Sequence, residues 1–183
     1  MNNKLRIGLA QINLTVGDFP GNTDKIIEYI KKAGNNNIDI LVFPELTTMG
    51  YPPSDLLLKS NFINENIKAL NNITQSVSGS MYVILGYVRQ EEGKLFNSAA
   101  ILHDKKIQNF VTKTLLPNYD VFNEKRYYTP AREIKPVEVK INGQNIRLGV
   151  EICEDIWNSA DQPPVTKKLV EQGFGKKEDL NCA

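Results

Sequence analysis

The stretch Ile38-Asp39-Ile40-Leu41-Val42-Phe43-Pro44-Glu45 is a short apolar run that ends in a carboxylate. It follows a segment with helical spacing, whose apolar residues share one face: Ile26, Ile27, Ile30 and Ala33. A short apolar run after a helix predicts a strand buried on both faces. Alternating apolar residues over positions 4–12 predict an earlier strand, and Asn22 is the expected N-cap of the helix between the two. The chain therefore opens with a predicted βαβ unit.

Hairpin signals dominate the rest of the chain. After a second predicted helix that ends near Val77, three strands follow in quick succession, and Asn142-Gly143 marks a further tight hairpin. A last helix is expected over residues 164–172. The remaining predicted strands cover residues 81–88, 95–102, 107–113, 134–141 and 146–152. Together these elements predict an α/β fold with a mixed sheet and helices on its outer faces.

Composition narrows the function classes. The chain has 183 residues, 41% hydrophobic and 23% charged, with a formal net charge of +1. These values are typical of a globular protein, and the length suits one domain. A near-zero net charge gives no long-range attraction to nucleic acid or to an anionic membrane. The longest apolar runs are shorter than the roughly 20 residues of a membrane helix, and no signal peptide is seen, so we expect a cytoplasmic protein.

Cysteine and histidine are scarce. Cys153 and Cys182 are the two cysteines and predict no disulfide framework. His103 is the single histidine, which excludes a multi-histidine metal site. It lies in a predicted hairpin turn, where an exposed turn residue is the ordinary interpretation. A cysteine enzyme with this sequence needs a base other than histidine.

Three reactive side chains share one property, which is that each ends a predicted strand. Glu45 follows the strand over residues 38–44, Lys113 ends the strand over 107–113, and Cys153 follows the strand over 146–152. Alone, each has an ordinary alternative: a loop glutamate, a solvated lysine and a small buried hydrophobe. If the strands lie side by side and point the same way, the three meet at one sheet edge. Base, cation and nucleophile then make a complete acyl-transfer site.

The segments around these residues resemble the three signature blocks of the nitrilase (carbon–nitrogen hydrolase) superfamily. The blocks are Phe43–Leu46, Thr112–Pro117 and Gly149–Asp155, in the family's order. The flanking segments Gly50–Leu57 and Cys153–Trp157 are especially similar to the glutaminase domains of glutamine-dependent NAD synthetases. The resemblance implies a nitrilase-like αββα sandwich. It also implies hydrolysis of L-glutamine, with no cofactor for this step and no metal.

The same resemblance assigns roles to matching positions. Cys153 would attack the amide carbon through a thioester, Glu45 would be the general base, and Lys113 and the backbone N–H of Glu154 would hold the oxyanion. Glu124 matches a second glutamate that orients the lysine, with a surface charge as the alternative. Tyr119 matches a substrate-pocket aromatic, with core packing as the alternative. The partner is a synthetase domain that uses ATP and Mg²⁺ and lies outside this chain, and homo-oligomers are left open.

The end of the chain departs from the family. After residue 172 the sequence is polar and glycine-rich, where the family continues with an apolar strand. We therefore expect a partial carbon–nitrogen hydrolase domain over residues 1–172, C-terminally incomplete, and a divergent or disordered tail over residues 173–183. Two alternatives remain: a hydrolase of another small amide from the same superfamily, and an inactive truncated fragment.

Overall fold

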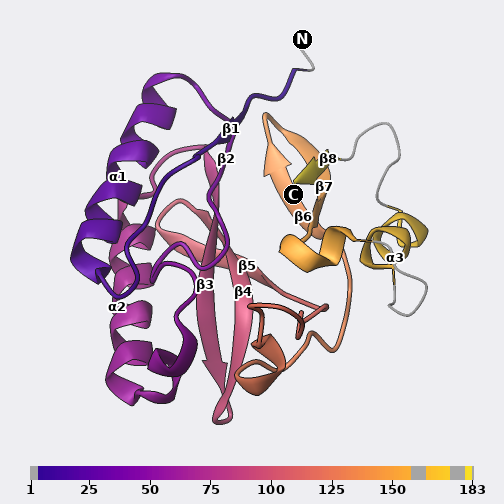
Figure 1. Cartoon of the computed structure of the whole chain (residues 1–183). Helices are drawn as coiled ribbons and strands as arrows, with labels where there is room; N and C mark the ends of the chain where they lie inside the picture. Colours follow the sequence, from indigo (N-terminus) through magenta and orange to yellow (C-terminus); the bar gives the residue numbers. More distant parts are fainter. Residues whose placement is uncertain (1–3, 158–163, 174–179, 183) are drawn as a thin grey trace. The chain divides into compact units, whose positions relative to one another are not determined.

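The computed structural model describes residues 4–157, 164–173 and 180–182 (Figure 1). The chain divides into two compact units. The first unit comprises Met1–Arg89 with Ala99–Phe110, and the second comprises Gln90–Ser98 with Val111–Ala183. Three strands of the central sheet, β3, β4 and β5, contribute residues to both units.

The regular elements follow the predicted order. The strands are β1 (Ile7–Leu9), β2 (Ile40–Val42), β3 (Tyr82–Glu91), β4 (Lys94–His103), β5 (Lys106–Thr112), β6 (Val137–Ile141), β7 (Gln144–Val150) and β8 (Leu180–Cys182). The α-helices are α1 (Phe19–Asn35), α2 (Ser60–Ser76) and α3 (Val165–Glu171). Short 3₁₀ helices are η1 (Ser54–Leu58), η2 (Glu124–Arg126) and η3 (Cys153–Ile156).

The predicted βαβ opening is confirmed. β1 pairs with β2 in parallel, and β2 pairs in parallel with β3, in a sheet of order β1-β2-β3-β4-β5. The helix cap differs from the prediction: the Asp18 carboxylate, not Asn22, accepts the N–H of Gly21 at 3.0 Å. The Asn22 side chain instead bonds the backbone N–H and C=O of Thr15.

The core of the first unit lies between the helices α1 and α2 and one face of the strands (Figure 1). Apolar residues of both helices meet apolar residues of β2, β3 and β4 there. Members with essentially no exposed surface are Ile26, Ile73, Val77, Val83, Leu85, Ala100 and Leu102. Full burial of one such large aliphatic side chain stabilises the fold by roughly 1.5–3 kcal/mol.

The second unit contains a separate three-stranded sheet, in the order β6-β7-β8. β6 and β7 form the predicted hairpin, and both Asn142 (φ 52°) and Gly143 (φ 82°) adopt the left-handed conformation that such turns require. The chain then returns through α3 to β8, which pairs in parallel with β7. A strand therefore lies at residues 180–182, inside the segment where the sequence predicts only a divergent tail. The connection from β7 through α3 therefore ends in a strand that pairs with β7.

Across the described ranges, each helix is too short or too polar to span a bilayer.

Candidate active site

Lys113 follows directly on β5, and its backbone is fixed on both sides. Its N–H donates to the carbonyl of Asn97 at 2.9 Å, and its own carbonyl accepts the N–H of Ala131 at 3.0 Å. The side chain is fully buried, which excludes the alternative of a solvated lysine. Because a buried ammonium is costly, its charge needs a compensating partner.

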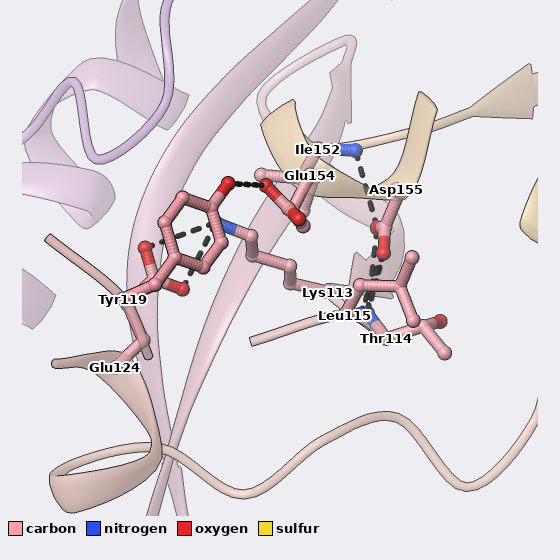
Figure 2. A network of polar contacts seen from close by, with 8 residues as sticks. All are labelled: Lys113, Thr114, Leu115, Tyr119, Glu124, Ile152, Glu154 and Asp155. Atoms are coloured by element: carbon pink, nitrogen blue, oxygen red, sulfur yellow. Dashed lines mark hydrogen bonds and ion pairs between the residues drawn. The ribbon is translucent and has the colours of Figure 1, made fainter. Parts of the chain in front are cut away.

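Glu124 supplies that compensation. The ammonium Nζ of Lys113 lies 3.0 Å from Oε1 and 2.9 Å from Oε2 of Glu124, and the Glu124 residue is only 4% exposed (Figure 2). Glu124 opens η2, and its N–H donates to the carbonyl of Pro117 at 3.1 Å. The alternative of a surface charge is excluded for this residue. A buried carboxylate on a fixed helical turn therefore holds the lysine in place.

Cys153 lies on a sharp turn after β7. It begins η3 with φ at +50°, a left-handed conformation that non-glycine residues rarely adopt. Such a conformation costs roughly 1–3 kcal/mol and persists only where the surroundings impose it. Cys153 is exposed and forms no disulfide, which excludes the alternative of a small buried hydrophobe. An exposed thiol on an imposed turn is a suitable nucleophile.

Tyr119 and Glu154 form a hydrogen-bonded pair beside this turn. The Tyr119 hydroxyl donates to Oε2 of Glu154 at 2.8 Å (Figure 2). The Tyr119 ring meets the ring of Phe122 edge-on. This hydrogen bond is the main cause that raises the pKa of Tyr119, with smaller contributions from burial and nearby charges. The Tyr119 residue is 49% exposed, so it does not serve as core packing.

Asp155 is a site residue that sequence reasoning missed. Its side chain is buried, and its carboxylate accepts hydrogen bonds from three backbone N–H groups (Figure 2). Burial raises the pKa of Asp155 to about 6, although these N–H groups and the charge of Lys113 act in the opposite direction. The available signal was an acidic residue two positions after a candidate nucleophile, at the end of a buried strand. The bonded groups are Leu115 N at 2.7 Å and Thr114 N at 3.0 Å to Oδ1, and Ile152 N at 3.2 Å to Oδ2.

Glu45 belongs to the first unit, in the loop that follows β2. The next residue, Leu46, has φ at 48°, and the N–H of Thr48 donates to the carbonyl of Gly86 in β3 at 3.2 Å. A Cβ at Gly86 would lie 2.4 Å from the Leu46 nitrogen and 2.6 Å from the Pro44 oxygen. The absence of a side chain at Gly86 therefore lets this loop pack directly on the strand. Glu45 is half-buried there.

Six candidate residues thus belong to one unit: Lys113, Tyr119, Glu124, Cys153, Glu154 and Asp155. The predicted convergence of Glu45 with Lys113 and Cys153 stays a prediction. Among residues 4–157, 164–173 and 180–182, no three His, Cys, Asp or Glu side chains gather as ligands of one metal ion would.

The sequence pattern of the carbon–nitrogen hydrolase family matches residues 6–161. The chain belongs to the carbon–nitrogen hydrolase family. Among curated relatives, this family member is 43% identical over 159 residues to the glutamine-dependent NAD(+) synthetase of Thermotoga maritima, covering 86% of this chain and 27% of that protein. It is 37% identical over 159 residues to the synthetase of Synechocystis, covering 83% and 28%. The chain thus spans little more than a quarter of the length of these relatives.

Solved structures confirm the predicted nitrilase-like α/β class. The glutamine-dependent NAD+ synthetase of Acinetobacter baumannii, in complex with ADP, superposes with a TM-score of 0.80 at 32% identity, covering 98% of this carbon–nitrogen hydrolase chain and 32% of that one. An amidase from Nesterenkonia superposes with a TM-score of 0.73 at 19% identity, covering 92% and 61%. The amidase likeness concerns the fold alone.

Proposed function

We propose that this carbon–nitrogen hydrolase chain is the glutamine-hydrolysing, ammonia-releasing part of a glutamine-dependent NAD synthetase. The observation that carries the proposal is the fully buried ammonium of Lys113, fixed by Glu124, in the same unit as the exposed thiol of Cys153. Acyl transfer without histidine needs a desolvated, fixed cation and an accessible thiol. The similarity to NAD synthetases supports glutamine as the amide.

The reaction runs in two halves. The Cys153 sulfur bonds to the side-chain amide carbon of glutamine while Glu45 takes the thiol proton, and the carbonyl oxygen becomes an oxyanion. The C–N bond then breaks, Glu45 passes the proton to the nitrogen, and ammonia leaves a γ-glutamyl thioester. A water molecule, deprotonated by Glu45, attacks the thioester, and glutamate leaves as the thiol is restored. Glu45 thus acts as both general base and general acid, and each proton that it accepts is passed on in the same half of the reaction.

Lys113 and the backbone N–H of Glu154 hold the oxyanion in both halves. One preorganised donor of this kind lowers the barrier by about 2.7–4 kcal/mol. Preorganisation is the property that the Glu124 pair confers, because the ammonium cannot rotate away without leaving two buried charges apart. Glu124 is thus a positioning residue for Lys113 in this proposal.

Substrate and partners follow from the same assignment. Tyr119, half-exposed and bonded to Glu154, contributes to the pocket for L-glutamine. The proposed partner is a synthetase portion that receives the ammonia and uses ATP with Mg²⁺. The amidohydrolase step itself uses the chain's own side chains and no cofactor.

Ammonia release from glutamine tests the proposal. The purified chain is incubated with glutamine, asparagine and simple aliphatic amides, and ammonia is measured for the wild type and for Cys153→Ala. We expect release from glutamine above the other amides, and none from Cys153→Ala. A preference for aliphatic amides would indicate another amidase of the family, and undiminished release by Cys153→Ala would refute the mechanism.

A further inference from the structure

We propose that Asp155 is a positioning residue that sets the Cys153 thiol against the Lys113 ammonium by tying their two backbone segments together. The inference rests on the proposed function, which assigns those two groups their chemistry. It goes beyond that function because it assigns a role to a side chain outside the proposed reaction.

The placement of the hydrogen bonds carries the argument. Oδ1 of Asp155 accepts from the N–H groups of Leu115 and Thr114, and Thr114 is the residue directly after Lys113. Oδ2 accepts from the N–H of Ile152, the residue directly before Cys153. One carboxylate therefore binds the residue next to the proposed cation and the residue next to the proposed nucleophile. The cation, Lys113, and the nucleophile, Cys153, lie 40 positions apart in the sequence.

The turn at Cys153 depends on the same side chain. The N–H of Asp155 donates back to the carbonyl of Ile152 at 3.1 Å, while its carboxylate accepts the N–H of Ile152. These two reciprocal bonds enclose Cys153, whose φ of +50° has to be imposed from outside. The Asp155 residue is 2% exposed, so water cannot replace the bonds readily.

An aspartate is the side chain that this arrangement requires. The side chain needs two oxygens that both accept hydrogen bonds, because N–H donors lie on two sides of it: those of Thr114 and Leu115 on one side and that of Ile152 on the other. Asparagine has nearly the same shape but only one acceptor oxygen. If that oxygen faces Thr114 and Leu115, the amide NH₂ faces the N–H of Ile152, and two donors oppose each other. Asp155→Asn therefore releases one segment while leaving the volume unchanged.

Glutamine kinetics and thiol reactivity test the proposal together. For Asp155→Asn we expect kcat per folded molecule to fall by about 10- to 100-fold, since small misplacements cost this much, with KM changed by less than about threefold. Alkylation of Cys153 by iodoacetamide, followed by peptide mass spectrometry, should slow by about fivefold because thiolate stabilisation by Lys113 is weakened. Loss of a nearby negative charge alone would speed alkylation, so slowing reports misplacement.

A stability control separates positioning from folding. Val139→Ala removes buried volume from β6 in the same unit, and Val139 has no part in the proposed site. Its kcat and Cys153 alkylation rate, corrected for the folded fraction, should match the wild type. If Asp155→Asn does not fold, Asp155→Glu is measured instead, and its extra methylene should lower kcat and alkylation in the same direction.

The outcomes are distinct. Wild-type kcat per folded molecule, or unchanged or faster alkylation, in the folded Asp155 variant would overturn the positioning role. A wild-type chain that releases no ammonia from any amide would instead refute the proposed function. In that case the alkylation rates of the wild type and the variant still decide whether Asp155 sets the reactivity of Cys153.

Discussion

The Nζ of Lys113 lies 2.9 Å from Oε2 of Glu124, and both side chains are shielded from solvent. Burial removes both charges from water, so each depends on the other. A substitution of either residue therefore leaves the other charge buried without this partner.

Glu124→Gln leaves the Lys113 ammonium buried beside a neutral amide. We expect a loss of roughly 3 kcal/mol in the free energy of unfolding, the scale seen when one partner of a buried pair is removed. We also expect kcat to fall by about 100-fold because the ammonium is no longer fixed. Urea denaturation and ammonia release measure the two effects.

The matched control is Glu133→Gln in the same unit. Glu133 pairs with Lys135 at 2.8 Å, but both side chains are about 70% exposed. An exposed pair contributes about 0–1 kcal/mol, so this variant should retain stability and kcat. If Glu124→Gln lost no more stability and kcat than Glu133→Gln, burial of the Lys113–Glu124 pair would have no effect on either quantity.

Gly86→Ala tests the loop that carries Glu45. The added Cβ would meet the Leu46 nitrogen at 2.4 Å and the Pro44 oxygen at 2.6 Å, and both are backbone atoms that cannot rotate aside. We expect a destabilisation of about 1–3 kcal/mol and a lower kcat, because Glu45 moves with the loop. Gly34→Ala, in α1 with nothing within 4 Å of the new Cβ, should instead stabilise by roughly 0.5–1 kcal/mol. Thermal unfolding of both variants measures this difference, and equal unfolding temperatures would contradict the steric argument at Gly86.

Tyr119→Phe removes the hydroxyl that donates to Glu154 and keeps the ring. A single hydrogen bond contributes about 0.5–1.5 kcal/mol, so if Tyr119 has its proposed role in the glutamine pocket, KM for glutamine should rise by roughly 2- to 10-fold. kcat should change less, because the hydroxyl takes no part in proton transfer. A large fall in kcat with unchanged KM would place Tyr119 in the chemistry and not in the pocket.

Glu151 makes the free energy of unfolding depend on pH. Burial raises the pKa of Glu151, and the Thr166 hydroxyl opposes this only in part. The folded state therefore binds the Glu151 proton more tightly than the unfolded state. The contribution of this proton to the free energy of unfolding is fully present below the pKa of Glu151 in the unfolded chain. It is lost as the pH rises through the pKa of Glu151 in the folded chain. Glu151→Gln should accordingly gain stability over the wild type at pH 7.5, and the gain should shrink towards pH 4.

Urea denaturation at both pH values measures this difference. Glu138→Gln, on the exposed side of β6, serves as the control and should follow the wild type at each pH. A gain for Glu151→Gln that is as large at pH 4 as at pH 7.5 would mean that the Glu151 charge has no influence on folding.

Much of the fold follows from apolar patterning. Continuous apolar runs and hairpin signals locate the strands because burial and turn conformation are local properties of the sequence. Residues 180–182 escape this logic, since β8 pairs through its backbone and has no apolar run to mark it. Patterning likewise does not reveal the division into two units.

The sequence predicts those candidate site residues that lie at the ends of strands. It does not predict the one whose side chain forms hydrogen bonds with main-chain N–H groups. Lys113 and Cys153 are predicted from their positions at strand ends, and the burial of Glu124 excludes the surface charge that was the alternative for this residue. The hydrogen bonds of Asp155 go to main-chain N–H groups, which every residue but proline carries. The sequence therefore marks Asp155 only as an acidic residue two positions after the candidate nucleophile, and it does not indicate which N–H groups its carboxylate binds.

The central claim is that Cys153 forms a covalent bond with the glutamyl group during turnover. The direct measurement is acid quenching of the chain during glutamine hydrolysis, followed by mass spectrometry of the peptide that contains Cys153. The account predicts a γ-glutamyl adduct on Cys153 that disappears once glutamine is exhausted, and none on Cys182. Sustained ammonia release with an unmodified Cys153 peptide at every time point would contradict it.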